Sequence, residues 1–472
     1  MLLLLTLLSW GLTGQSQPAR TSVEAIRFIK LGNTLRMVNR PQQAVDILLR
    51  AVPAVQSKDN YQEAVAYENL GFAYNDLDNS QAAVRYFQKA LVLYQKLAYA
   101  ASEAAMRQLI AETSGKDLYA GIDVGSSGVK LAIFRTTFKD GFYAKDIKSK
   151  PIAPNVTLVS GTTQSFQAGK EVVKAYMDSI RHYNIPPERV YVAFSSGVNE
   201  ALGKTPARKR ILYELLSAQL TSNVPSKTIL SIDTTLTAAR EAELFMIGSI
   251  PRKYWAISSC MDIGSGNTKG GYYDANRRFH AVNFPVGTKT LVSQIDPNQS
   301  LDINAYKQEA KRVVATMAEK AIAAAFDKAS SGMLQRKTVA FGGGIAWAMT
   351  AYLHPEKVTT TAVTLTKGDV ENFVRLATTD YQALTHPNLT NLTDPILRRK
   401  AEADISNAQN QFNEKQIIAG ALLLDAIFNA YAKTTVPKQL VFIRDSDISW
   451  VTAKFLEALN QNYERAIARG AQ

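Results

Sequence analysis

Two short turns rich in glycine and serine, each preceded by an aspartate, are the residues of this chain best suited to chemistry. The turns are Gly125-Ser126-Ser127-Gly128 and Gly264-Ser265-Gly266-Asn267, and the aspartates are Asp123 and Asp262. Glycine-rich turns can aim consecutive backbone N–H groups into one concavity, and serine hydroxyls add donors, so such turns bind anionic oxygens. A carboxylate beside them can hold Mg²⁺. The pair therefore predicts a phosphate group held from both sides, with Mg²⁺ as a cofactor on the two aspartates.

Alternating apolar residues on both sides of the first turn predict the strands that position it. They are Leu118, Ala120, Ile122 and Val124 before the turn, and Val129, Leu131 and Ile133 after it. This period of two is typical of a β-hairpin, and it places the aspartate at a strand end. Two ordinary hairpins with serine-rich turns would show the same pattern, so that alternative stays open.

A third glycine run, Gly342-Gly343-Gly344, follows the apolar pair Val339-Ala340 and precedes the helix-like segment 345–349. A strand, a turn of bare backbone and a helix start can form a floor for a phosphate or a nucleotide, because the N–H groups at a helix N-terminus favour anions. This third segment favours one binding site over three unrelated turns.

In type and order, these segments resemble the phosphate-1, phosphate-2 and adenosine-type motifs of the actin-like ATPase superfamily. Two further segments resemble the exopolyphosphatase/guanosine pentaphosphate phosphatase family within it: the glutamate-bearing stretch 239–248, and the stretch 416–422 with a strand at 439–443 behind it. The resemblance covers about residues 117–465. It implies an α/β fold class, the two-lobed actin-like ATPase (ribonuclease H-like) fold, with an all-α domain before it.

The resemblance also implies roles for individual residues in a metal-dependent hydrolysis of phosphoanhydrides. Asp123 and Asp262 would be catalytic by positioning Mg²⁺, and Glu241 would orient the attacking water. The ligand would be polyphosphate, guanosine pentaphosphate or a nucleotide. Spacing alone favours Glu241 as one more charge on an amphipathic helix, and the resemblance makes the catalytic role an equal alternative.

Three departures from the family's pattern favour a second function. The family's second turn ends in a glutamate, whereas Lys269 stands here, so a cation replaces an anion. The segment 233–236 replaces a Ser-Gly pair followed by acidic residues, and the segment 194–199 replaces an arginine-bearing loop. These departures favour a catalytically degenerate scaffold that binds a phosphorylated ligand and recruits protein partners.

Lys130 supports a third hypothesis, an actin-like ATPase. Actin and many sugar kinases place a lysine at this position, where it meets nucleotide phosphate, and the glycine run 342–344 would then serve the nucleotide. A lysine can act as a point charge on phosphate oxygens, although an outward position on a hairpin strand would equally leave it solvated.

The residues before this domain predict two helical repeats, over residues 21–113. The positions that recur are Leu31-Gly32, Leu35, Ala44, Leu48 and Ala51 in the first copy, and Leu70-Gly71, Tyr74, Ala83, Phe87 and Ala90 in the second. This is the tetratricopeptide spacing of paired helices, and a groove for a protein partner would follow from it; a generic helical hairpin is the alternative. We expect the apolar stretch 91–110 to supply a capping helix, and Pro41 and Pro53 to mark helix boundaries.

The chain divides into four predicted parts. They are a secretory leader at 1–20, the helical repeats at 21–113, lobe I with the first turn at 117–256, and lobe II with the second turn and the glycine run at 257–472. The apolar start of the leader is too short to span a bilayer, and it lacks a basic n-region. We expect an exported or periplasmic protein if the leader functions, and a cytoplasmic one otherwise.

The composition is that of a globular protein, with 472 residues of which 46% are hydrophobic and 20% charged. The net charge of +13 favours polyanions such as polyphosphate. Cys260 is the single cysteine and predicts a buried core residue, and four scattered histidines give no zinc pattern. We expect no nucleic-acid partner and no stable membrane span, while the oligomeric state stays open.

Overall fold

The computed structural model describes residues 17–114, 116–126, 128–139, 142–154, 156, 158–220, 230–328 and 331–469. Most of the predicted leader, and Ser127 of the first turn, lie outside these ranges. The chain forms two compact units, the first made of residues 1–117, 135–146 and 458–472, and the second of residues 118–134 and 147–457.

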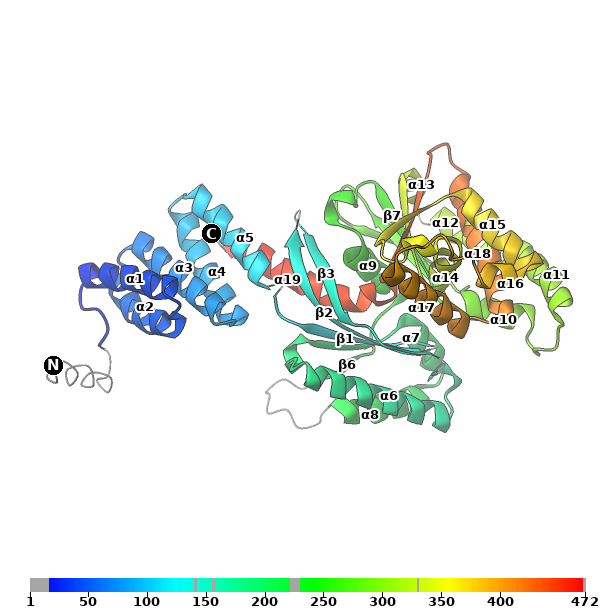
Figure 1. The fold of residues 1–472 in the computed structure, drawn as a ribbon, viewed down its shortest axis with the longest axis horizontal. Helices are drawn as coiled ribbons and strands as arrows, with labels where there is room; N and C mark the ends of the chain where they lie inside the picture. Colours follow the sequence, from blue (N-terminus) through cyan, green and yellow to red (C-terminus); the bar gives the residue numbers. More distant parts are fainter. Residues whose placement is uncertain are drawn as a thin grey trace. The chain divides into compact units, whose positions relative to one another are not determined.

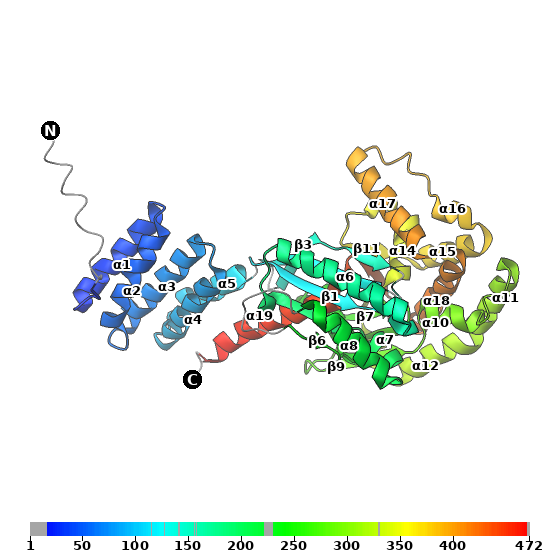
Figure 2. The same ribbon diagram turned by 90° about the horizontal axis from the view of Figure 1, so that it is seen from below.

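The first unit contains the paired helices that the repeat spacing predicts (Figure 2). The helices are α1 (Ser22–Met37), α2 (Pro41–Val55), α3 (Asn60–Asp76), α4 (Ser80–Lys96) and α5 (Ala100–Ser114). Each helix is joined to the next by a short turn containing one residue with a positive φ angle, namely Asn39, Ser57, Asp78 and Ala98. The same turn geometry therefore recurs along the unit, as in a repeat.

Corresponding glycines let the two helices of each repeat approach closely. A Cβ atom on Gly32 would collide with Leu48, and one on Gly71 would collide with Phe87. Leu48 and Phe87 are fully buried in the core of this unit. The recurrence of these positions thus has a packing cause, and the prediction of helical repeats is confirmed.

Two expectations about these helices need correction. The stretch 91–110 supplies a helix, α5, that packs on the repeats, but only from Ala100 onward, because α4 ends at Lys96 and Ala98 between them is left-handed (φ 56°). Both helices bury apolar residues in the same core, so hydrophobicity alone did not reveal the turn. Pro41 does begin α2, but Pro53 lies inside its last turn.

The second unit contains one six-stranded sheet and most of another, of which residues 135–146 belong to the first unit (Figure 1). We call the part built on the first sheet lobe I; its strand order is β3-β2-β1-β5-β6, with β4 paired to β2. The strands are β1 (Tyr119–Val124), β2 (Gly128–Lys139), β3 (Phe142–Ser149), β4 (Ile152–Pro154), β5 (Val190–Phe194) and β6 (Ile232–Asp233). β1 and β2 form the antiparallel hairpin that the alternation predicts, and β1 runs parallel to β5.

The second sheet, in the part that we call lobe II, has the order β11-β12-β10-β7-β8-β9. Its strands are β7 (Ser258–Ile263), β8 (Thr268–Tyr273), β9 (Phe279–Phe284), β10 (Thr338–Gly342), β11 (Ala362–Leu365) and β12 (Gln439–Ile443). The second turn joins β7 and β8 in an antiparallel hairpin, and β10 runs parallel to both β7 and β12. The predicted strands at 339–340 and 439–443 are confirmed.

Helices cover both sheets. They are α6 (Thr163–His182), α7 (Ser196–Gly203), α8 (Pro206–Leu220), α9 (Ala238–Ser249), α10 (Thr288–Ile295), α11 (Ile303–Val313), α12 (Glu319–Lys328), α13 (Ser331–Gln335), α14 (Gly344–Leu353), α15 (Lys367–Thr379), α16 (Tyr381–Thr385), α17 (Pro395–Gln411), α18 (Glu414–Ala432) and α19 (Ser449–Arg469). A π-helical segment, η4 (Val314–Ala318), lies between α11 and α12, and short 3₁₀ turns are η1 (Leu158–Ser160), η2 (Pro187–Arg189), η3 (Arg252–Tyr254), η5 (Pro355–Lys357) and η6 (Ser446–Ile448). Among the helices in the described ranges, none combines the length and the apolarity of a membrane span.

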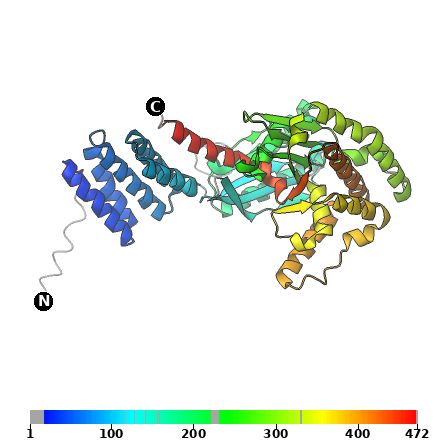
Figure 3. The same ribbon diagram turned by 90° about the horizontal axis from the view of Figure 1, so that it is seen from above.

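Each sheet shares a hydrophobic core with a particular set of helices, and these sets define the layers of the unit. Helices α6 and α8 pack on one face of the first sheet, and α11, α12, α15 and α18 pack on the second sheet, grouped together in Figure 3 in yellow-green to brown. Helices α9 and α19 lie between the sheets, where Phe245 and Val451 meet Ala193 of lobe I and Cys260 of lobe II. Cys260 is fully buried, as predicted. The inner layer thus connects the two lobes.

The crossing of α9 and α19 depends on Gly248, because a Cβ atom there would collide with the backbone carbonyl of Ser449. We predict that Gly248→Ala lowers the free energy of unfolding by about 1–3 kcal/mol, the usual effect of overpacking. Gly203→Ala is the matched control, since a Cβ at this helical glycine meets nothing within 4 Å. Urea unfolding followed by tryptophan fluorescence measures both, and an equal effect of the two substitutions would contradict the close crossing.

Candidate functional site

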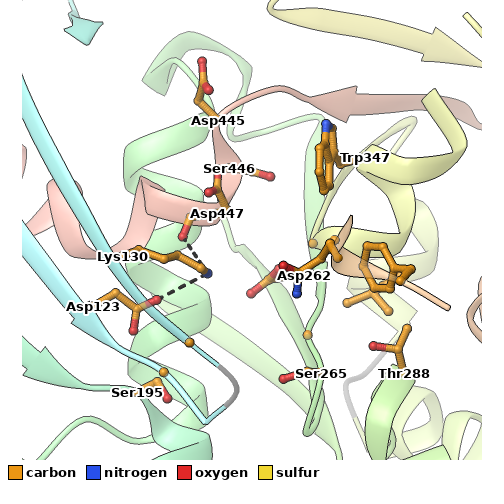
Figure 4. Close-up of a pocket in the computed structure, with 18 of the residues that line it drawn as sticks. Asp123, Lys130, Ser195, Asp262, Ser265, Thr288, Trp347, Asp445, Ser446 and Asp447 are labelled. Atoms are coloured by element: carbon orange, nitrogen blue, oxygen red, sulfur yellow. Dashed lines mark hydrogen bonds and ion pairs between the residues drawn. The ribbon is translucent and has the colours of Figure 1, made fainter. Parts of the chain in front are cut away.

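Both glycine-rich turns and part of the glycine run line one cleft in the second unit, with a volume of about 770 Å³ (Figure 4). Lobe I contributes the first turn and the start of α7. Lobe II contributes the second turn, the start of α14 and the segment after β12. The fold thus brings together segments that are far apart in the sequence, as the resemblance implies.

The two turns are closed by equivalent backbone hydrogen bonds and contact each other. In each, the first glycine donates its N–H to the carbonyl of the fourth residue, at 2.9 Å in the first turn and 3.0 Å in the second. The hydroxyl oxygens of Ser126 and Ser265 lie 3.2 Å apart and share a hydrogen bond, and Asn267 Nδ2 donates to Ser196 Oγ at 3.5 Å. The donors predicted to hold phosphate therefore gather where the lobes meet.

Each hairpin carries a matching aspartate–lysine pair. Asp123 is directly opposite Lys130 across β1 and β2, and Asp262 is directly opposite Lys269 across β7 and β8. Residues opposed in an antiparallel pair have neighbouring side chains. The Lys130 Nζ–Asp123 Oδ2 distance is 3.4 Å, and the Lys269 Nζ–Asp262 Oδ2 distance is 3.3 Å. The two lysines are thus equivalent, a relation between the hairpins that the sequence analysis missed.

Glu241 lies at the same place, and both of its carboxylate oxygens are engaged. Lys269 Nζ lies 3.0 Å from Oε1, and the backbone N–H of Ser196 donates to Oε2 at 2.9 Å. The side chains of Glu241 and Lys269 are only 3% and 6% exposed. Glu241 is therefore not a solvated charge on the surface of α9. Lys269 is held between Glu241 and Asp262.

Burial and ion pairing together set the charge of these groups. Burial alone would lower the pKa of Lys269, but the carboxylates of Glu241 and Asp262 outweigh it and raise that pKa. The pKa of Lys130 is likewise raised by Asp123 and Asp447 against the effect of burial. Burial raises the pKa of Asp123 to about 6 despite Lys130, and it also raises the pKa of Asp262. Both lysines therefore carry their charge at neutral pH.

The residues present do not fit the Mg²⁺ site that the resemblance implies. Each of the two aspartates predicted to hold the ion already has an ammonium within 3.4 Å. A divalent cation on the same carboxylates would be repelled by each lysine by on the order of 5 kcal/mol at an effective dielectric constant near 20. Within the described ranges, no group of three or more side chains of the kinds that ligate metals comes together.

A second ion cluster in the cleft was also missed from the sequence. Lys150 Nζ lies 2.6 Å from Asp445 Oδ1 and 3.2 Å from Asp447 Oδ1, and Lys130 donates to the Asp447 carbonyl at 3.3 Å. Burial would lower the pKa of Lys150, but the two carboxylates raise it to about 12. Asp445 is left-handed (φ 59°) in the turn after β12. The acidic residues that directly follow the predicted strand 439–443 were the available signal.

The glycine run predicted as a phosphate or nucleotide floor lies only partly in the cleft. Gly343 and Gly344 line the cleft. Gly343 needs to be glycine, because its φ of 95° suits no other residue well and a Cβ there would collide with the backbone of Ile263. Gly342 packs inside the lobe instead, since a Cβ there would collide with the ring of Phe245.

Ion pairs engage every acidic side chain that lines the cleft. The pairs are Asp123–Lys130, Glu241–Lys269, Asp262–Lys269, Asp404–Arg444, Asp445–Lys150 and Asp447–Lys150. Two further lysines of the lining, Lys289 and Lys400, have no ion-pair partner among the described residues. Lys289 follows the N-terminus of α10 and donates its backbone N–H to Ser265 of the second turn. The cleft thus offers unpaired cations and no unpaired carboxylate.

The raised pKa of Asp123 gives a pH-dependent stability. Between the usual aspartate pKa of 3.8 and about 6, the folded protein holds a proton that the unfolded chain has lost. This carboxyl therefore contributes most to stability below pH 3.8, and the contribution is lost as the pH rises through 6. From pH 4 to pH 7.5, we predict that the wild-type free energy of unfolding falls by about 2 kcal/mol relative to Asp123→Asn, which cannot titrate.

Urea unfolding at a series of pH values measures this difference. Asp327→Asn, at an exposed position on α12, is the control and should keep the wild-type pH dependence. Parallel curves for the wild type and Asp123→Asn would contradict the perturbed carboxyl.

Comparisons with known proteins bear on the fold. A family profile described as a tetratricopeptide repeat matches residues 59–98. No curated protein matches the sequence. Among solved structures, an exopolyphosphatase-like protein has a TM-score of 0.52 at 12% identity, covering 73% of this chain and 98% of its own.

Two further structures are similar over comparable lengths. A Ppx/GppA family member from Aquifex aeolicus has a TM-score of 0.47 at 17% identity, over 73% of this chain and 98% of its own. An exopolyphosphatase from Cytophaga hutchinsonii has a TM-score of 0.48 at 15% identity, over 72% of this chain and 98% of its own. At such identities a likeness shows the fold alone. The chain has the actin-like α/β fold of exopolyphosphatase-like proteins, with a tetratricopeptide repeat in its N-terminal helices.

Proposed function

We propose that the cleft binds an oligophosphate anion, such as polyphosphate, guanosine pentaphosphate or a nucleotide, without hydrolysing it. The observation that carries this proposal is the position of Lys269, whose buried ammonium pairs with both Glu241 and Asp262. The donors for phosphate remain, because the two turns face one another and Lys289 has no ion-pair partner among the described residues. Binding is therefore supported where catalysis is not.

The engagement of Glu241 argues against its predicted catalytic role. A general base must reach the water that it activates, with one carboxylate oxygen free to accept a proton. Here one oxygen accepts the Lys269 ammonium, and the other accepts the N–H of Ser196. To take a proton from water, Glu241 would have to weaken its pairing with Lys269 or Ser196, and a buried ammonium that lost its carboxylate would be costly.

A second candidate function is hydrolysis of a phosphoanhydride with Asp123 orienting the attacking water. It is favoured by one observation: Asp123 Oδ1 is buried and has no hydrogen-bond partner among the residues that the structure describes. Its pKa of about 6 would leave the group largely ionised at neutral pH. Mg²⁺ has no role in either proposal, because the carboxylates that would hold it carry lysine partners.

The repeats support a role in recruiting a protein partner. Stacked helix pairs present an extended surface to a partner segment. Tyr61 and Tyr99 are exposed on this unit, with their rings in edge contact at 5.8 Å. Together, the two units are consistent with a protein that couples phosphate-ligand binding to protein recruitment. Export of such a protein remains a proposal, since the predicted leader lies mostly outside the described residues.

The decisive experiment measures binding and phosphate release on the same purified protein. Calorimetry with tripolyphosphate, guanosine pentaphosphate and ATP should show binding, whereas phosphate release should not exceed that of Asp123→Ala/Asp262→Ala. Glu241→Gln should leave the release rate within about twofold of the wild type, because loss of a working general base would lower it by about 10²–10⁴.

Phosphate release that the double alanine variant abolishes would overturn the binding proposal and favour hydrolysis. A lower rate of that release in Glu241→Gln would indicate that Glu241 orients the attacking water. An unchanged rate in that variant would favour Asp123 in this role. Absence of both binding and release would exclude the cleft as an oligophosphate site.

A further inference from the structure

The charges of the cleft decide in which form a phosphate ligand can enter it. Oligophosphates in solution exist both as free anions and as magnesium complexes. A site that takes the complex must offer carboxylates or other oxygens to the metal. A site that takes the free anion must offer cations and N–H donors. The lining of this cleft can be compared with both requirements.

The lining meets the second requirement and not the first. All six of its acidic side chains are in ion pairs with Lys130, Lys150, Lys269 or Arg444. Lys289 and Lys400 carry no ion pair among the described residues and remain for an anion. Lys289 is half-buried next to the second turn, and Lys400 is exposed at the C-terminal part of the lining.

The aspartate–lysine pairs have a regularity that supports this assignment. In both hairpins the lysine stands directly opposite the aspartate at the strand end, so the same exclusion occurs on each side of the cleft. One lysine beside one aspartate could be a local replacement without meaning for the ligand. Two equivalent lysines place a fixed positive charge at both positions where a bridging metal ion would bind its carboxylates.

We propose that this cleft selects the magnesium-free form of its oligophosphate ligand, with the Lys130 and Lys269 ammonium groups in the place of a divalent cation. The inference rests on the proposed binding function. Mg²⁺ then acts as a competitor, because it complexes the ligand and removes the form that binds. The apparent dissociation constant should equal the intrinsic constant divided by the fraction of free ligand.

The experiment is a calorimetric titration of the full-length protein with tripolyphosphate, first in EDTA and then at rising free Mg²⁺ at constant ionic strength. When nine-tenths of the ligand is complexed, the apparent dissociation constant should rise about tenfold. Lys289→Met should weaken binding about tenfold in EDTA and keep the same dependence on Mg²⁺. Lys311→Met, at an exposed position of α11 outside the cleft, is the matched control and should behave as the wild type.

The outcomes separate this inference from the function on which it rests. Binding that is unchanged or tightened by Mg²⁺ would overturn the inference and leave the binding function standing. Phosphate release would instead overturn the binding function. Absence of binding both in EDTA and in Mg²⁺ would overturn both. In Lys269→Glu the effect of Mg²⁺ on affinity should be reversed. A folded variant should bind tripolyphosphate more tightly as Mg²⁺ is added.

Discussion

The buried ammonium of Lys269 is the interaction on which the chemistry of this cleft depends. It neutralises Glu241 and Asp262, whose side chains are 3% and 13% exposed, and it joins α9, in the layer between the lobes, to the hairpin of the second turn. Buried charges persist only when they are paired and hydrogen-bonded, and Ser196 supplies the remaining bond to Glu241. The packing of α9, the charge of the cleft and the proposed preference for a metal-free ligand therefore all depend on Lys269.

Both hairpins pair an aspartate with a lysine in this way, but the two lysines differ in exposure. Lys130 is more exposed than Lys269, and it also donates to the carbonyl of Asp447 from the segment after β12. Lys150 adds a further bridge from lobe I to the same segment. Lobe I is thus tied to lobe II by ion pairs on one side of the turns, and by the apolar layer of α9 and α19 behind them. The likeness to exopolyphosphatase-like structures describes this framework and not the charge pairs within it.

Local patterns in the sequence predicted the strands around the turns and most of the elements that line the cleft, but not its electrostatics. Alternation around the first turn predicted β1 and β2, because an antiparallel hairpin is set by neighbours in sequence. The pairing of Lys269 with Glu241 depends on where α9 packs against the second sheet, which no local pattern encodes. For the same reason Gly342 was grouped with the cleft, although Phe245 of α9 packs against it. The continuous apolarity of 91–110 concealed a turn, since both helices bury residues in one core.

The contact between Ser126 and Ser265 bears on how the molecule would respond to a ligand. Their hydroxyl oxygens are 3.2 Å apart, which leaves no space for a phosphate group between them. Two donors about 3 Å apart can still each reach a different oxygen of one phosphate from the same side, as the nitrogens of a bidentate arginine do. A phosphate that leaves this contact intact would therefore lie beside the serine pair and not between the turns. In that arrangement the two turns act as one bidentate donor, and ligand binding requires no change in their separation.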